Sequence, residues 1–248
     1  MNMNPSRKRA DVALVERGLF ESRARAQAAI EAGLVFADGR KITKSSEPIA
    51  ADAVIQAEQA YPYVSRGGVK LAGALARYPI AIEGYVCLDV GASTGGFTEV
   101  LLAEGASLVF AVDVGRDQLH PSLRGHPKII SMEQTDIRDL EGKRLPARPD
   151  VVVIDASFIS LKTVLPAALA LAAAPMSLLA LIKPQFEAQG RHNKRGIIKD
   201  AKVHRAVCDD IASFAASLGC TDITVFPSSI EGGDGNIEFF LGARRGGA

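Results

Sequence analysis

The chain has 248 residues, of which 48% are hydrophobic and 23% charged, an ordinary globular composition with room for one large domain and a small one. Its net charge of +1 is unevenly spread. Residues 1–70 carry 11 Lys or Arg against 8 Asp or Glu, a net of +3, whereas residues 71–248 carry 18 against 20, a net of −2. This asymmetry weakly indicates that the front end meets an anion such as nucleic acid.

The cysteine pattern argues against disulfides and against a metal centre. Cys87, Cys208 and Cys220 are an odd number without paired spacing, which predicts reduced core thiols in a reducing compartment and hence a cytoplasmic protein. The four histidines show no ligand spacing with these cysteines. We therefore expect no metal.

Membrane insertion is also not expected. The N-terminus is basic, but no apolar segment follows it, so a signal peptide is not expected. Val164–Ile182 contains 19 residues without a charge, close to the length of a membrane span. Pro166 and Pro175 interrupt it, and a surface helix near 160–173 followed by a buried strand at 177–182 explains it better.

Residues 8–59 have the pattern of a compact α+β module. A short amphipathic helix ends near Gly18, and Ser22 can cap a second helix that runs through Ile30. Gly33 supplies the end of that helix, Asp38-Gly39 predicts a hairpin, and residues 54–57 a further strand.

The stretch from Arg9 to Gly39 resembles the S-four-type RNA-binding module of a ribosomal protein, pseudouridine synthases and some synthetases. In that family the second helix and the following hairpin face RNA phosphates. The resemblance thus implies RNA contacts for Arg23, Arg25, Arg40 and Lys41. The alternative is that these four are solvated surface charges.

From residue 84 onward, apolar strands alternate with helical stretches. This order predicts a doubly wound α/β sheet with helices on both faces. Strands are expected near 86–89, 107–113, 128–131, 151–155, 177–182, 222–226 and 237–242, the last one antiparallel. The domains we expect are an RNA-binding module at 1–60, a linker with a helix from Val69 to Arg77 at 61–82, the sheet domain at 83–243 and a disordered tail at 244–248.

A glycine-rich turn follows the first of these strands and opens a helix, as in cofactor-binding folds. Its glycines, Gly91, Gly95 and Gly96, read G-x-x-x-G-G and not G-x-G-x-x-G, which disfavours a dinucleotide. Asp113, at the end of the second strand, can hold a ribose diol. Asp136 favours S-adenosylmethionine because a carboxylate there can accept the adenine amino group, although it could instead be a helix cap. Asp89 also favours this cofactor, because a carboxylate suits its cationic methionine moiety. The cofactor-binding residues we predict are Asp89, Gly91, Ala92, Ser93, Thr94, Gly95, Gly96, Phe97, Thr98, Asp113, Asp136, Ile137 and Asp155.

Four ionisable residues stand at marked positions: Asp155 and Lys183 end apolar runs, Glu238 lies within the apolar stretch 235–241, and Lys70 follows Gly67-Gly68. A buried charge is costly unless it is paired or used, so the set predicts one shared polar site. Asp155-Ala-Ser-Phe158 lacks the Pro-Pro-aromatic sequence of base N-methylating enzymes. None of the cysteines follows proline, which disfavours cytosine C5 chemistry.

Five ordered blocks then show a close resemblance to a known family. They are residues 63–71, 89–98, 155–160, 181–187 and 235–239, and together with the front module they resemble the TlyA-type, hemolysin-like ribosomal RNA methyltransferases, whose catalytic domain is FtsJ-like. The resemblance implies a Rossmann-like class I methyltransferase fold, S-adenosylmethionine as cofactor, ribosomal RNA or ribosomal subunits as partner, and 2′-O-methylation of a cytidine. It places the catalytic tetrad on Lys70, Asp155, Lys183 and Glu238.

The segment after Phe186 departs from the family pattern, because Lys194-Arg195-Gly196 stands where family members have a Gly-Lys-Gly-Gly-like stretch. Its basic residues, together with Arg66, are further candidates for RNA phosphates. These candidates are Arg66, Arg191, Lys194 and Arg195.

Lys183 is the candidate for activating a ribose hydroxyl. A free lysine keeps its proton to about pH 10, so Lys183 would act as a base only if its neighbours favoured the neutral form. Lys70 would favour that form, whereas Asp155 and Glu238 would favour the ammonium, which could orient the hydroxyl and stabilise the developing alkoxide. Three alternatives stay open: structural ion pairs, a membrane-active hemolysin, and a non-catalytic RNA-binding assembly factor.

Overall fold

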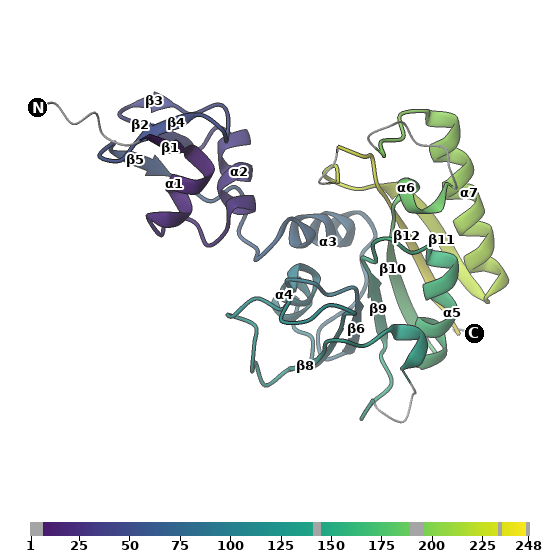
Figure 1. Ribbon diagram of the computed structural model, residues 1–248. Helices are drawn as coiled ribbons and strands as arrows, with labels where there is room; N and C mark the ends of the chain where they lie inside the picture. The colour runs from purple at the N-terminus through teal and green to yellow at the C-terminus, as the bar shows by residue number, and fades with distance from the viewer. Residues whose placement is uncertain (1–6, 141–144, 189–195, 233–234, 247–248) are drawn as a thin grey trace, which may run out of the picture. The chain divides into compact units, whose positions relative to one another are not determined.

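The computed structural model describes residues 7–140, 145–188, 196–232 and 235–246. The chain divides into two compact units, Met1–Pro62 and Tyr63–Ala248 (Figure 1). The helix that carries Lys70 therefore belongs to the second unit, whereas the sequence predicted it as part of a linker region.

In its described residues, 7–62, the first unit contains two helices and two small antiparallel sheets. Ser22 caps the second helix by accepting a hydrogen bond from the Arg25 N–H at 3.3 Å, as predicted. Asp38 and Gly39 both have positive φ and turn the expected hairpin. The elements are β1 (Arg7–Arg9), α1 (Ala10–Glu16), α2 (Arg23–Glu31), β2 (Val35–Ala37), β3 (Arg40–Lys41), β4 (Pro48–Ala50) and β5 (Ile55–Ala57). The hairpin of β2 and β3 and the further strand β5 were expected, whereas the order β3-β2-β5 and the pairing of β1 with β4 were not predicted.

Asp11 is the polar centre of this unit and is fully buried. Its carboxylate accepts hydrogen bonds from Arg9 Nε at 3.0 Å, Arg23 Nη2 at 2.7 Å and Gln27 Nε2 at 2.8 Å. The hydrogen bond with the Arg9 guanidinium is the main reason that the pKa of this carboxyl lies well below its usual range. The hydrogen bonds with Arg23 and Gln27 lower the pKa further, whereas burial opposes them. Arg23 thus helps to tie α1 to α2, whether or not it also meets RNA.

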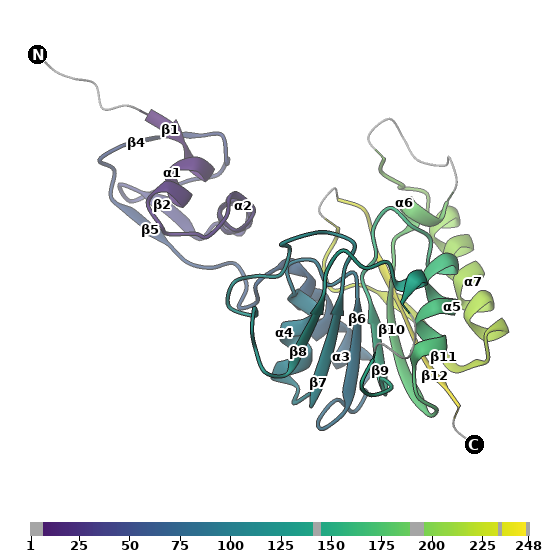
Figure 2. The same ribbon diagram turned by 60° about the horizontal axis from the view of Figure 1, so that its bottom comes forward.

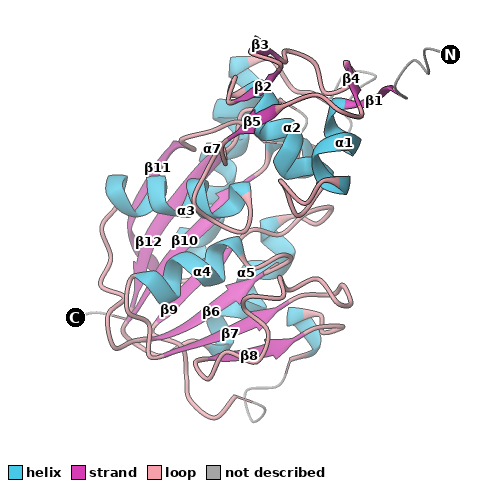
Figure 3. Cartoon of the chain, turned by 90° about the vertical axis from the view of Figure 1, so that its left-hand side faces the viewer, coloured by secondary structure: helices cyan, strands magenta, loops and turns pink. Residues whose placement is uncertain are grey.

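The second unit is built on a seven-stranded sheet of order β11-β12-β10-β9-β6-β7-β8 (Figure 3). The strands β6 to β10 are parallel, and β12 is antiparallel to both β10 and β11. The strands are β6 (Val86–Val90), β7 (Leu108–Val112), β8 (Ile129–Met132), β9 (Val151–Ile154), β10 (Met176–Ile182), β11 (Cys220–Pro227) and β12 (Phe239–Arg245). This arrangement confirms the predicted doubly wound fold with an antiparallel last strand.

Helices cover both faces of this sheet (Figure 2). One hydrophobic core packs α3 (Arg66–Arg77) and α4 (Gly96–Ala103) on one face. The other packs α5 (Leu161–Leu171), α7 (Ala201–Ser217) and the short helix η1 (Ile137–Asp139) on the opposite face. The one-turn helix α6 (Pro184–Glu187) follows β10 directly.

Several sequence expectations are corrected by these boundaries. Arg244 and Arg245 lie in β12 and pair with Ser177 and Met176 of β10, so the predicted disordered tail was wrong at these positions. The helix expected from Val69 begins three residues earlier, at Arg66. No helix in the described part of the chain is long and apolar enough to cross a membrane.

We predict that Asp11→Ala loosens the first unit. The side chains of Arg9, Arg23 and Gln27 and the Val12 N–H lose their shared acceptor, so the free energy of unfolding should fall by about 1 to 3 kcal/mol. The loss should be seen as faster hydrogen exchange at α1 and α2 amides. Because the folded-state pKa of Asp11 is lowered, its contribution is present above about pH 4 and is lost as the pH falls further. The exposed Asp52, changed to alanine, is the control, and equal exchange in both variants would contradict the role of Asp11.

Candidate active site

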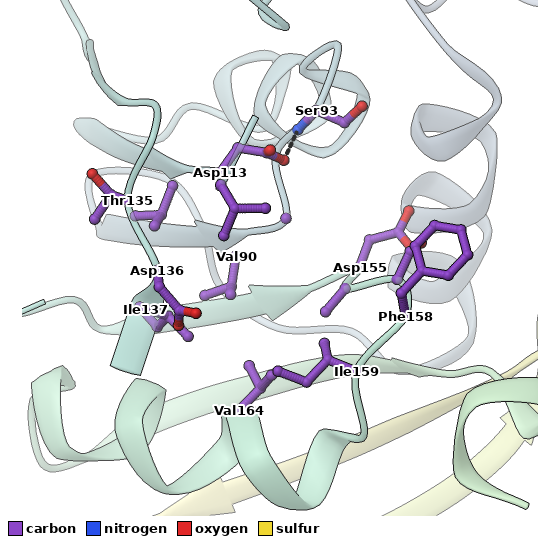
Figure 4. A pocket seen from close by; sticks show the side chains of 15 residues that line it. Val90, Ser93, Asp113, Thr135, Asp136, Ile137, Asp155, Phe158, Ile159 and Val164 are labelled. Carbon is purple, nitrogen blue, oxygen red and sulfur yellow. Dashed lines mark hydrogen bonds between the residues drawn. The ribbon is translucent and has the colours of Figure 1, made fainter. Parts of the chain in front are cut away.

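A cavity of about 370 Å³ opens at the carboxyl ends of the parallel strands (Figure 4). This edge is where open α/β sheets bind ligands. Its walls come from β6, β7, η1 and the segment after β9. The lining residues are Val90, Gly91, Ser93, Val112, Asp113, Val114, Thr135, Asp136, Ile137, Asp155, Ala156, Ser157, Phe158, Ile159 and Val164.

The glycine-rich turn forms one rim of this cavity. Gly91 has φ +82°, and a Cβ there would lie 2.7 Å from the Asp155 carbonyl oxygen, so the close approach of the turn to β9 requires glycine. The N–H of Ser93 donates to Asp113 Oδ2 at 2.8 Å. Of the predicted turn residues, Gly91 and Ser93 line the cavity. Ala92, Gly95, Gly96, Phe97 and Thr98 are buried, and Thr94 is partly buried.

Asp113 and Asp136 lie on the side of the cavity formed by β7 and η1. Asp113 Oδ1 accepts a second backbone bond from the Gly115 N–H at 2.7 Å, and each oxygen keeps a lone pair for a ligand. Asp136 caps η1 and pairs with Arg138 at 2.6 Å. The structure therefore gives Asp136 the helix-capping role and places it at the cavity as well.

Asp89 lies beneath the glycine-rich turn and is fully buried. Thr98 Oγ1 donates to its Oδ2 at 2.6 Å, while Oδ1 has no hydrogen-bond partner among the described residues. Burial raises the pKa of Asp89 to about 7, opposed by the Thr98 hydrogen bond. A buried carboxylate oxygen without a donor is costly, and a cationic ligand group beside it would relieve that cost.

Lys183 and Asp155 form an ion pair at 2.6 Å between Nζ and Oδ1. Lys183 Nζ also donates to Ser157 Oγ at 2.7 Å and lies 6.0 Å from the centre of the Phe186 ring. The Lys183 side chain is 9% exposed and that of Asp155 is 20% exposed. The ammonium group is thus largely withdrawn from water, and its carboxylate partner faces the cavity.

Lys70 and Glu238 form a second buried ion pair, at 2.6 Å between Nζ and Oε2. A Cβ on Gly232 would lie 2.6 Å from Glu238 Oε1, so the main chain at Gly232 packs directly on this carboxylate. Arg66 Nη2 donates to the Glu231 carbonyl oxygen at 2.7 Å, which holds that loop to the start of α3.

Strand register brings the two pairs together. Ile182 of β10 lies opposite Phe239 of β12 in antiparallel register, so Lys183 and Glu238 are neighbours one position beyond. Gly67 of α3 has its Cβ position 3.8 Å from Asp155 Oδ2, and Lys70 lies on the same helix face three residues later. The four predicted residues therefore gather at one edge of the sheet.

Most of the residues predicted to contact RNA from the first unit form hydrogen bonds or ion pairs with other residues of that unit. Arg23 binds Asp11, Arg25 Nε donates to Gln59 Oε1 at 3.1 Å, and Arg40 pairs with Glu47. Lys41 is exposed and forms no ion pair within the described ranges. Arg191, Lys194 and Arg195 lie outside the described residues.

Sequence reasoning missed the wall formed by residues 156–159. Phe158 has φ +63° and is 90% exposed, which is an unusual backbone and an unusual exposure for a phenylalanine. The Phe158 ring lies 4.9 Å from that of Phe186 in α6, a contact between segments that no local sequence pattern records. Among the described residues no cluster of His, Cys, Asp and Glu could hold a metal ion.

Comparisons with known proteins match this geometry. The model of the FtsJ-like methyltransferase family matches residues 63–245, and that of the S4 domain matches residues 8–55. The 16S/23S rRNA (cytidine-2′-O)-methyltransferase TlyA of Mycobacterium tuberculosis is 43% identical over 243 residues, which are 96% of this chain and 90% of that protein.

The chain belongs to the TlyA family of FtsJ-like methyltransferases. Hemolysin A of Brachyspira hyodysenteriae is 38% identical over 233 residues, 93% of this chain and 97% of that protein. A solved structure from Streptococcus thermophilus, described as a candidate hemolysin, superposes with a TM-score of 0.77 at 39% identity and covers 98% of this chain and 89% of the other.

The methyl donor of this TlyA-family chain is S-adenosylmethionine, and the cavity fits it. Asp113 faces the cavity with free lone pairs for a ribose diol, and Val114 and Ile137 offer apolar surface beside it. Asp89 does not line the cavity, but it directly precedes the lining residue Val90, and its Oδ1 has no hydrogen-bond partner among the described residues. Carboxylates and apolar walls suit a cationic nucleoside.

We predict that Asp89→Asn makes the stability of the ligand-free protein less dependent on pH. The folded-state pKa of about 7 lies above the unfolded value of about 3.9. The stabilisation by Asp89 is therefore complete below pH 4 and is lost as the pH rises toward 7. One pKa unit corresponds to about 1.4 kcal/mol. The difference between the unfolding free energies of Asp89→Asn and wild type, measured by denaturant titration, should therefore change by about 4 kcal/mol over that pH range. Exposed Asp117→Asn is the control, and parallel curves for wild type and Asp89→Asn would refute the assignment.

Proposed function

We propose that this chain transfers a methyl group from S-adenosylmethionine to the 2′-hydroxyl of a cytidine in ribosomal RNA. One observation carries the proposal: strand register and helix α3 bring Lys183, Asp155, Lys70 and Glu238 together beside a cavity suited to the methyl donor. The relative from Mycobacterium tuberculosis, named for 16S/23S rRNA (cytidine-2′-O) methylation, supports the same substrate.

The cofactor would be held by groups on β6, β7 and η1. Asp113 would bind the ribose hydroxyls, Val114 and Ile137 would contact the adenine, and Asp89 would face the positively charged end. When bound, S-adenosylmethionine supplies an electrophilic methyl group on a sulfonium. The residues after β9 close the remaining side of the cavity, so the methyl group would lie toward Asp155.

Lys183 would act on the ribose hydroxyl. Its ammonium group is held by one ion pair with Asp155 and one hydrogen bond to Ser157. This group would orient the hydroxyl oxygen and stabilise the negative charge that develops there. The bound cofactor would supply the methyl group to this oxygen and would leave as the neutral thioether, and the hydroxyl proton would pass to the Asp155 carboxylate or to water.

The pair of Lys70 and Glu238 would set the field around Lys183. Both side chains are nearly excluded from solvent, at 10% and 3% exposure, so their charges are weakly screened. Glu238, on the strand next to that of Lys183, would attract the Lys183 side chain. The positive charge of Lys70 would offset part of the negative charge of the two carboxylates. Alignment of the oxygen with the methyl group would supply much of the acceleration.

The front unit would bring the RNA to this site. Its S4 domain is an RNA-binding module, and exposed Lys41, with the outward parts of Arg25 and Arg40, would contact phosphates. The membrane-active alternative, to which the Brachyspira hyodysenteriae relative owes its name, explains neither the cavity nor the paired charges.

The first test is methyl transfer itself. Purified protein is incubated with labelled S-adenosylmethionine and, separately, small and large ribosomal subunits, and 2′-O-methyl positions are mapped. Lys183→Ala should lower the rate by about 100-fold or more while cofactor binding is retained, and exposed Lys202→Ala should behave as wild type.

Two outcomes would contradict the proposal. Cofactor binding without transfer to either subunit would indicate a different RNA or a non-catalytic role in assembly. A protein that binds no cofactor would overturn the assignment of the cavity.

Phe158 is positioned to receive the base of the target nucleotide. Its ring is 4.9 Å from that of Phe186, beside Lys183, and RNA bases that are drawn out of a helix commonly stack on exposed aromatics.

We predict that Phe158→Ala lowers kcat/KM for RNA by about tenfold or more, since one base stack is worth about 1 to 3 kcal/mol. Phe158→Trp should retain activity, and Tyr85→Ala, which removes an exposed ring elsewhere, is the control. Equal rates for the alanine variants at 158 and 85 would remove Phe158 from the substrate site.

A further inference from the structure

The one-turn helix α6 contacts the segment 155–161 at three separate points. Lys183, its N-cap, binds Asp155 and Ser157. Phe186 packs on Phe158. Glu187, one turn after Lys183, reaches the far end of the segment at the start of α5. The first two contacts involve the proposed catalytic groups, whereas Glu187 has no place in the chemistry described so far.

Glu187 binds the start of α5 through both carboxylate oxygens. Ser160 Oγ donates to Oε2 at 2.5 Å, and the Leu161 N–H donates to Oε1 at 2.8 Å. Ser160 is also the N-cap of α5 and accepts from the Lys162 N–H at 3.1 Å. The N–H groups of a first helical turn have no partner within the helix, so an acceptor from α6 fixes where α5 begins.

The surroundings of Glu187 act on its carboxyl group in opposing directions. The side chain is partly buried, and burial raises the pKa of its carboxyl against the opposing effect of its two hydrogen bonds. The charged groups that act on it are Lys162 of α5, which lowers that pKa, and Asp210 of α7, which raises it. Hydrogen bonds to a carboxylate are about twice as strong as those between neutral groups.

We propose that Glu187 is a positioning residue for methyl transfer. By holding Ser160 and Leu161 against α6, it fixes the segment that carries Ser157 and Phe158 relative to Lys183. Phe158 adopts a positive φ, which costs about 1 kcal/mol or more, and this conformation persists because the segment is held at both ends. The inference rests on the proposed function, since Ser157 and Phe158 are placed at the substrate side of the site.

The consequence is a separation between catalysis and cofactor binding. Of the groups assigned to the nucleoside, Asp113 and Val114 directly follow β7 and Ile137 begins η1. None of them contacts Glu187 in the hydrogen bonds and ion pairs of the described residues. Loss of the Glu187 carboxylate should therefore disturb the reacting geometry more than the grip on the nucleoside. A displacement of about 1 Å can cost about 100-fold in rate.

A fluorescent reporter tests the positional part without any turnover. The chain contains no tryptophan, so Phe158→Trp introduces a single one at the centre of the segment. In that background Glu187→Ala should increase the amplitude of fast local motion in time-resolved anisotropy, whereas Asp210→Asn should not. Asp210 is a matched control, because it contacts the same turn of α5 through Lys162, at 2.7 Å, from the exposed side. Unchanged anisotropy in Glu187→Ala would overturn the inference.

Kinetics on ribosomal subunits test the catalytic part. Glu187→Ala should lower kcat by about 10- to 100-fold, while its affinity for S-adenosylhomocysteine should stay within about threefold of wild type. Glu187→Gln keeps an acceptor for the Leu161 N–H and should recover most of the rate. This second variant also controls for a folding defect. A kcat that is unchanged, or that falls only in proportion to the loss of cofactor affinity, would refute the positioning role. If wild type transfers no methyl group, the proposed function fails, and the anisotropy result still decides whether Glu187 holds the segment.

Discussion

Two buried ion pairs at the carboxyl edge of the sheet are the constraint on which the rest of this structure depends. Lys183 with Asp155 and Lys70 with Glu238 place four charges where water is largely excluded. Such charges are tolerated only when they are paired, so the strands and α3 must deliver all four side chains to one place. The antiparallel pairing of β12 with β10 does this for Glu238 and Lys183.

Backbone strain and close main-chain contacts are concentrated at this carboxyl edge of the sheet, around the candidate active site. Gly91 approaches the main chain of Asp155, the main chain at Gly232 rests on the Glu238 carboxylate, and Phe158 has a positive φ. Each feature is unfavourable or sterically demanding in isolation. Together they leave a cavity between a carboxylate-bearing wall on β7 and a reactive wall after β9, and α6 joins the reactive wall to the end of β10 through Lys183, Phe186 and Glu187.

Much of the architecture could be predicted because it follows from local patterns. Hydrophobic periodicity indicated the strands and most helices, Ser22 and Asp38-Gly39 indicated a cap and a hairpin, and the order of elements indicated a doubly wound sheet. The prediction was wrong at Arg244 and Arg245, which were assigned to a disordered tail. They lie in β12, because an antiparallel strand between two others gains hydrogen bonds on both sides.

The sequence by itself determined the family, most of the elements and the identity of the charged residues, since those depend on residue type and spacing. Only the tertiary structure decided which charges pair, that Asp89 keeps an orphaned oxygen, that Arg23 serves Asp11, and that Glu187 reaches the start of α5. The physical reason is that ion pairing and burial depend on distances between segments far apart in the chain. Strand register and helix packing set those distances, and no local pattern records them.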